Sequence, residues 1–66
     1  MNIYVNNQNI EVAQEITISQ LLDIQKVKTT YIAIEINNEI IPKSKYLNHI
    51  IHDGDKIEII TAVGGG

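Results

Sequence analysis

The residues of this chain with the most evident chemical potential are its last three, Gly64, Gly65 and Gly66, which follow a strand-like segment at residues 56–61. Glycine has no Cβ and adopts backbone angles that other residues avoid, so such a tail can lie extended in a channel too narrow for larger side chains. The terminal carboxylate is also unhindered, which suits acyl transfer once it is activated. We therefore expect Gly66 to be the reacting residue, with a frayed chain end as the alternative.

The other polar residues do not predict a catalytic or metal site. His49 and His52 are three residues apart, but a zinc site needs further ligands that the sequence does not supply. The Asp-Gly-Asp segment at residues 53–55 lacks the twelve-residue calcium-loop pattern and predicts a turn. Ser19 and Ser44 have no plausible His-Asp partners, and the chain contains no cysteine. We expect no catalytic residue, no metal and no cofactor.

Composition predicts one small globular domain, because the 66 residues are 44% hydrophobic and 20% charged. The formal net charge is −3 and the chain has no arginine and no basic run, which argues against nucleic acid as a partner. The N-terminus lacks the pattern of a signal peptide, and no segment approaches the ~20 apolar residues of a membrane span. We expect a cytoplasmic protein with no membrane partner.

Hydrophobic periodicity in the first half of the chain predicts a hairpin and a helix. Residues 1–5 and 10–12 alternate apolar and polar side chains, and asparagines lie between them, as in a β-hairpin. Thr17 followed by Gln20 fits a capping box, so a helix should begin at about Ser19.

The second half predicts three strands and, between the second and third, a short turn or a single helical turn. Residues 31–36 and 39–41 form a second hairpin, ended by Pro42. Residues 43–51 are compatible with a single helical turn, and residues 56–61 form the last strand. The resulting fold class is α+β, a mixed sheet of about five strands covered on one face by one helix.

The strand alternation assigns side chains to the two faces of this sheet. The expected core residues are Ile3, Val5, Ile10, Val12, Leu21, Leu22, Ile24, Ile32, Ile34, Ile36, Ile57 and Ile59. The expected residues of the opposite face are Tyr4, Tyr31, Ala33 and Ile60. Tyrosine is common at interface cores, so we expect these four residues to dock a partner; the alternative is ordinary scattered apolar exposure.

Over its whole length the chain resembles the ThiS family, the sulfur carriers of thiamine biosynthesis, which have the ubiquitin-like β-grasp fold. The resemblance rests on the order of elements, the hydrophobic-Asn-x-x-hydrophobic-hydrophobic-Pro segment at residues 36–42, the Asp-Gly-Asp turn and the ending at residues 62–66. It implies a β-grasp domain at residues 1–61 and a flexible tail at residues 62–66. Gly65 and Gly66 match the family's functional positions, and Gly64 is an additional glycine that extends the arm.

The resemblance also implies that the chain is a carrier substrate and not an enzyme. An E1-like adenylyltransferase, ThiF, would use ATP and magnesium to convert the Gly66 carboxylate into an acyl-adenylate. Sulfur from a desulfurase would replace AMP, and the resulting thiocarboxylate would donate its sulfur to thiazole synthase, ThiG. Because related carriers share the Gly-Gly ending, the alternatives are a ubiquitin-like protein modifier and a sulfur carrier for molybdopterin or tRNA thiolation. A non-covalent interaction module with an inert tail is a further alternative.

Overall fold

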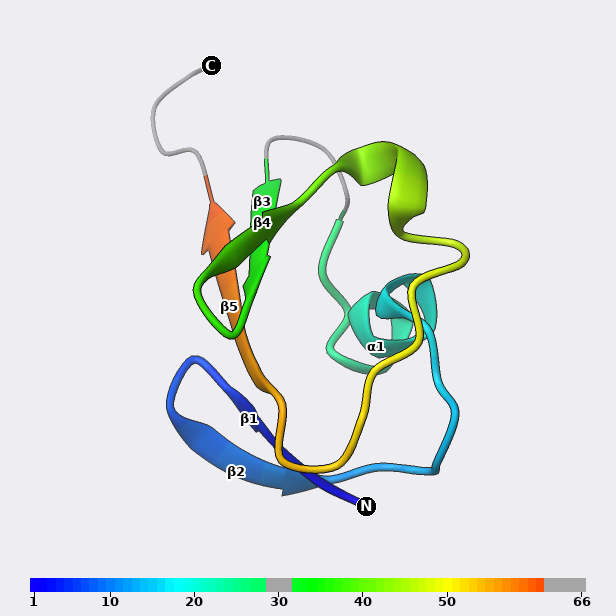
Figure 1. The fold of residues 1–66 in the computed structure, drawn as a ribbon, viewed down its shortest axis with the longest axis vertical. Coiled ribbons are helices and arrows are strands. Elements are labelled where there is room, and N and C mark those ends of the chain that lie inside the picture. Colours follow the sequence, from blue (N-terminus) through cyan, green and yellow to red (C-terminus); the bar gives the residue numbers. More distant parts are fainter. Residues whose placement is uncertain (29–31, 62–66) are drawn as a thin grey trace.

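The computed structural model describes residues 1–28 and 32–61, which form a single five-stranded sheet with one α-helix (Figure 1). In chain order the elements are β1 (Asn2–Val5), β2 (Gln8–Glu11), α1 (Ile18–Ile24), β3 (Ile32–Ile36), β4 (Glu39–Ile41), a 3-10 turn at Lys43–Lys45, and β5 (Lys56–Thr61). The strand order is β2-β1-β5-β3-β4, so the last strand of the chain lies in the centre. β5 is parallel to β1 and antiparallel to β3.

Both hairpins turn through two asparagines. Asn6 and Asn7 connect β1 to β2 with φ angles of 50° and 69°, and Asn37 and Asn38 connect β3 to β4 with φ angles of 52° and 70°. Two-residue hairpin loops with positive φ at both positions twist in the same sense as the strands they join, and asparagine tolerates this backbone conformation better than most residues. The two predicted hairpins are therefore confirmed, but β2 begins at Gln8 and not at residue 10 as predicted, because the turn needs only Asn6 and Asn7.

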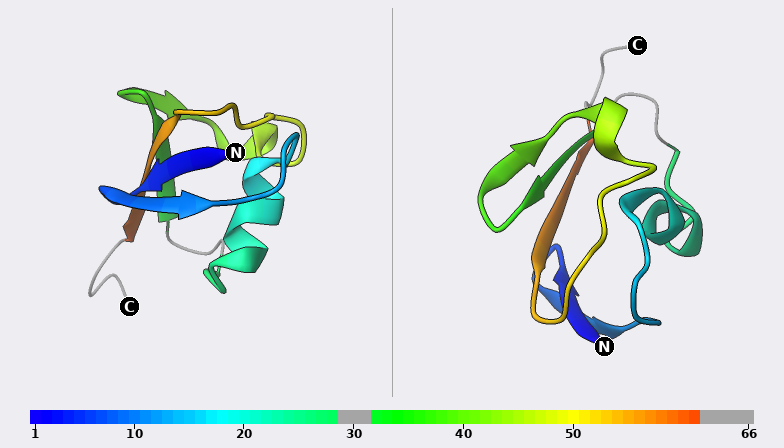
Figure 2. Two further views of the ribbon diagram at one scale, coloured as in Figure 1. Left: turned by 90° about the horizontal axis from the view of Figure 1, so that it is seen from below. Right: turned by 45° about the vertical axis from the view of Figure 1, so that its right-hand side comes forward.

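Helix α1 lies against one face of the sheet, and no other described element covers the opposite face (Figure 2). The helix begins at Ile18 with Thr17 as its N-cap. The Thr17 Oγ1 accepts a hydrogen bond from the backbone N–H of Gln20 at 3.2 Å, and the Gln20 Oε1 accepts one from the backbone N–H of Thr17 at 2.8 Å. The predicted capping box is confirmed, and it satisfies two backbone donors that would otherwise lack partners.

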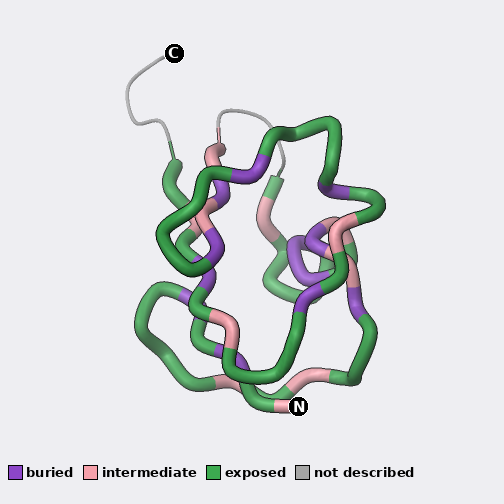
Figure 3. The backbone as a smooth tube through the Cα atoms, viewed as in Figure 1, coloured by how far each residue is buried: buried purple, intermediate pink, exposed green. Residues whose placement is uncertain are grey.

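The core lies between the helix and the sheet (Figure 3). Most of the predicted core residues are buried or pack partly buried against it, but the prediction for Ile24 was wrong, since this side chain is 54% exposed. Ile18, Leu21 and Leu22 form the buried stripe of the helix. At 100° per residue, Ile24 lies about 120° around the helix from Ile18 and faces solvent.

The core also contains residues that periodicity did not predict. They come from the segment before the helix, the first residue of α1, the last residue of β4 and the segment after β4: Ile16, Ile18, Ile41, Tyr46 and Ile51. The backbone of this region is joined to the helix start, because Ile18 N donates to His49 O at 3.1 Å and Ile51 N donates to Ile16 O at 2.8 Å. Residues 42–51 thus close one side of the core.

Candidate functional site

The predicted reacting residue and its tail, Gly64, Gly65 and Gly66, lie outside the described residues, as does Tyr31. The description ends at Thr61, the exposed last residue of β5. β5 runs through the centre of the sheet and points away from Met1 (Figure 1). The strand that leads toward the C-terminus therefore has strand neighbours on both sides. Hydrogen bonds to both neighbours fix β5 in the sheet.

The second half of β5 has unequal support from its two neighbours. It pairs with β3 from Ile57 to Thr61, whereas its pairing with β1 covers only Lys56 and Ile57. Asn6 continues the β1 side after the strand has ended: its backbone N–H donates to Ile57 O at 2.9 Å, and its Oδ1 accepts from Ile59 N at 2.8 Å. The Asn6 Oδ1 thus accepts the hydrogen bond that a backbone carbonyl of a longer β1 would accept.

The start of β5 is held by Asn37. The Asn37 backbone N–H donates to Lys56 O at 2.8 Å, and the Asn37 Oδ1 accepts from Lys56 N at 3.0 Å. The Asn37 Nδ2 donates to Asp55 Oδ1 at 3.0 Å, and the other oxygen of that carboxylate accepts from His52 N at 2.8 Å. Two sequence motifs that lie far apart along the chain, the asparagine of residues 36–42 and the Asp-Gly-Asp segment, therefore form one hydrogen-bonded unit.

The Asp-Gly-Asp segment is a turn, as predicted. Gly54 has a φ of 84°, in the left-handed region that favours glycine. Its N–H donates to Asn2 O at 2.7 Å, and the Asp53 Oδ1 accepts from Asn2 N at 2.8 Å. Asp53 and Gly54 therefore both bond to the backbone of Asn2, which connects the turn before β5 to the start of β1.

The predicted docking residues that the structure describes lie on the uncovered face of the sheet. Tyr4 is 40% exposed, Ile60 is 44% exposed and Ala33 is half-buried. Ala33 and Ile60 are direct cross-strand partners. Tyr4 is the partner of Lys56, four residues earlier on β5, or about 13 Å along the strand. The structure thus places Ala33 and Ile60 side by side and separates Tyr4 from them.

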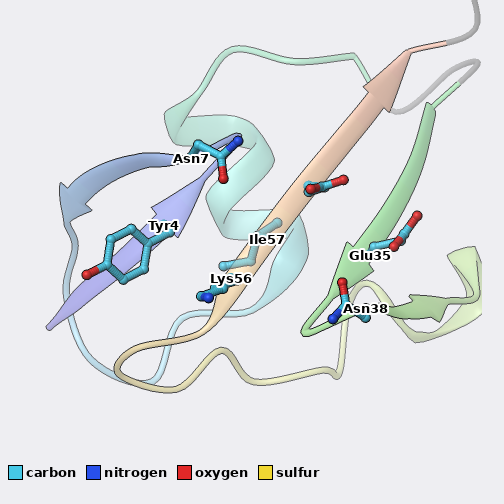
Figure 4. A pocket seen from close by; sticks show the side chains of 7 residues that line it. Tyr4, Asn7, Glu35, Asn38, Lys56 and Ile57 are labelled. Carbon is cyan, nitrogen blue, oxygen red and sulfur yellow. The ribbon is translucent and has the colours of Figure 1, made fainter.

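Charged side chains occupy the space between these apolar positions. A hollow of about 50 Å³ is lined by Tyr4, Asn7, Glu35, Asn38, Lys56, Ile57 and Glu58 (Figure 4). Glu35 and Glu58 are direct cross-strand partners on β3 and β5. This hollow is far smaller than typical small-molecule sites, so it suits the end of one side chain. The alternation along each strand explains why both glutamates face outward, and the register between β3 and β5 places them opposite each other.

A second, more open hollow of about 320 Å³ lies near the N-terminus, lined by Met1, Gln14, Glu15, Ile50, Ile51, His52 and Asp53. His49 does not line it. Across residues 1–28 and 32–61, no three His, Cys, Asp or Glu side chains are placed to hold a metal ion. No described helix has the length and apolar character needed to span a membrane.

Comparison with known proteins identifies the family. The model of the ThiS family matches residues 2–66. The chain belongs to the ThiS family. It is 32% identical over 66 residues to the sulfur carrier protein ThiS of Escherichia coli strain K12, with both chains covered completely. The crystal structure of the thiamine biosynthesis protein ThiS from Geobacter metallireducens superposes with a TM-score of 0.86 at 30% identity, again over the whole of both chains.

A third relative of this ThiS-family chain is longer. It is a thiazole synthase from Paramagnetospirillum magneticum, which is 36% identical over 66 residues, and the present chain spans 20% of its length. Together with the fold, these comparisons confirm the expected β-grasp architecture and the assignment to the sulfur carriers of thiamine biosynthesis.

Proposed function

We propose that the carboxylate of Gly66 is the group that receives, holds and delivers sulfur for thiazole formation. The membership of the ThiS family over residues 2–66 is the observation that supports this proposal most directly. A free carboxylate is a weak electrophile, so ATP first converts it into an acyl-adenylate and pyrophosphate leaves. Magnesium and the chemistry of this step belong to the activating enzyme, ThiF.

Sulfur then replaces AMP at the same acyl carbon. A sulfur nucleophile forms the new C–S bond, the C–O bond to AMP breaks, and AMP takes the electron pair. If a desulfurase supplies the sulfur as a persulfide, the first product is an acyl disulfide, and a thiol must reduce its S–S bond to leave the thiocarboxylate. Gly64 and Gly65 have no side chains, so this part of the tail can enter a channel that is too narrow for other residues.

Thiazole synthase, ThiG, is the proposed acceptor of this sulfur. The longer relative supports this partner, because a single polypeptide with the name thiazole synthase includes a segment similar to the whole of this chain. We further propose that the uncovered sheet face, with Tyr4, Ala33 and Ile60, docks the partner enzymes, together with Tyr31, which the sequence predicts to belong to the same face. Ordering a glycine tail costs roughly 1 to 2 kcal/mol per residue, so a folded surface is needed to supply binding energy and specificity. A cytoplasmic location stays a prediction from the sequence.

Intact-mass spectrometry tests the proposal. The chain is incubated with its adenylyltransferase, ATP, magnesium and a sulfur donor, and the expected product has one C-terminal oxygen replaced by sulfur. A chain with one alanine appended after Gly66 should remain unmodified. Absence of both adenylate and thiocarboxylate, with an enzyme proven active on another ThiS-family carrier, would reject the proposal. A ladder of covalent conjugates in cells would instead support the protein-modifier alternative.

A further inference from the structure

The centre of the uncovered sheet face contains two carboxylates that repel each other. Glu35 and Glu58 are direct cross-strand partners, and like charges in this arrangement destabilise a sheet. Glu35 is half-buried and Glu58 is exposed. Among the described residues, the side-chain hydrogen bonds are made by other groups, and neither carboxylate takes part in one. The fold therefore contains an unfavourable pair without an internal hydrogen bond that offsets it.

Lys56 is the nearest cation along the same strand and face. It lies two residues before Glu58, or about 7 Å along β5. One ammonium group matches one carboxylate in charge, so the group formed by Glu35, Glu58 and Lys56 keeps a net charge of −1. Tyr4 and these three side chains line the same hollow (Figure 4).

Apolar side chains surround this charged centre. Ile40 on the edge strand β4 is the cross-strand partner of Glu35 and is 69% exposed. Ala33 and Ile60 form the next outward pair toward the end of β5, and Tyr4 lies on the β1 side. Covering the aliphatic and aromatic residues with a partner would exclude water from the glutamates between them. A carboxylate that loses water without gaining a cation is strongly unfavourable, so the partner must supply one.

We infer that the adenylyltransferase that docks on this face presents an arginine guanidinium to Glu35 and Glu58, flanked by apolar side chains that cover Ile40, Ile60 and Tyr4. The inference rests on the proposed function and specifies the chemistry of its docking surface. A guanidinium has donors pointing in several directions in one plane, so it can bond to both carboxylates of a cross-strand pair, whose Cβ atoms lie about 5 Å apart. The adenylyltransferase is the partner chosen because it must bind the unmodified carrier before any later step.

The test uses the full chain and measures two properties of Glu35→Gln, Glu58→Gln and the double variant. Binding to the adenylyltransferase should weaken about tenfold for each single variant, because a charge-assisted bond is lost at a largely covered site. The urea midpoint of the free chain should rise, because the repulsion is relieved. A merely structural role would move stability and affinity in the same direction. Added salt should weaken the wild-type complex more than that of the double variant.

Glu15→Gln is the matched control, since it makes the same change of charge in the loop before the helix, at the second hollow. It should leave the affinity unchanged. Gln variants of Glu35 and Glu58 that bind as tightly as the wild type, or more tightly, would overturn the inference. Thiocarboxylate formation with excess enzyme is measured in parallel. If the wild-type chain forms no thiocarboxylate, the proposed function fails; if it does and the Gln variants bind normally, only the arginine contact fails.

Discussion

Replacing Asn37 by alanine should destabilise the domain more than any other single change in its turns. The substitution removes the hydrogen bonds from Lys56 N to Asn37 Oδ1 and from Asn37 Nδ2 to Asp55 Oδ1, each 3.0 Å long. It also places an alanine at a φ of 52°. Two partly exposed hydrogen bonds contribute about 0.7 kcal/mol each, and the left-handed backbone costs alanine about 1 kcal/mol, so the expected loss is about 2.5 kcal/mol.

Asn38→Ala separates these two contributions. Asn38 has nearly the same backbone conformation, with a φ of 70°, but its side chain makes none of the hydrogen bonds found among the described residues. It should lose only the backbone contribution, about 1 kcal/mol. Asn37→Gly provides a second check, because glycine accepts the backbone angles and loses only the side-chain bonds, apart from the entropy of a more flexible unfolded chain.

Urea unfolding followed by circular dichroism measures all three variants, and hydrogen exchange at the Lys56 amide reports on the bond to Asn37 directly. Asn37→Ala should unfold at the lowest urea concentration and exchange the Lys56 amide fastest. Equal free energies of unfolding for Asn37→Ala and Asn38→Ala would show that the side-chain bonds contribute nothing. In that case the asparagine would serve the turn alone and would not fix the start of β5.

Three further predictions concern the helix and the core. Thr17→Ala should cost about 1 kcal/mol because it removes the N-cap bond, whereas Thr17→Ser should remain close to the wild type in urea unfolding. Ile18→Ala, at a fully buried position, should cost about 2 to 5 kcal/mol, and Ile24→Ala, at a position 54% exposed, should cost less than about 0.5 kcal/mol; a large loss at Ile24 would contradict its exposure. Burial raises the pKa of the Tyr46 phenol above its usual value of 10.0, so the folded state disfavours the ionised form. This contribution to stability should be complete below about pH 10 and lost as the pH rises through the folded-state pKa, and the difference between the wild type and Tyr46→Phe in urea midpoints across this range measures it.

Local signals predicted the elements of this fold correctly. Paired asparagines, the Thr17 and Gln20 capping box and the Asp-Gly-Asp turn each act within a few residues, so their consequences are visible in the sequence. The same signals did not reveal a second role of the asparagines. Asn6 and Asn37 were interpreted as turn residues, but in the folded chain their side chains also hold β5, which lies far away in sequence.

The candidate site, like the fold, could be predicted from the sequence only in part. The sequence alone determined the chemistry that the C-terminal glycines permit, and it determined which side chains of each strand point outward, because both depend on residue type and on the period of two along a strand. Only the tertiary structure decided that Glu35 faces Glu58, that Tyr4 lies beside Lys56, about 13 Å along β5 from Ile60, and that Ile51 and Tyr46 complete the core. These facts depend on the register between strands and on how irregular segments pack, and both are set by the whole buried core at once.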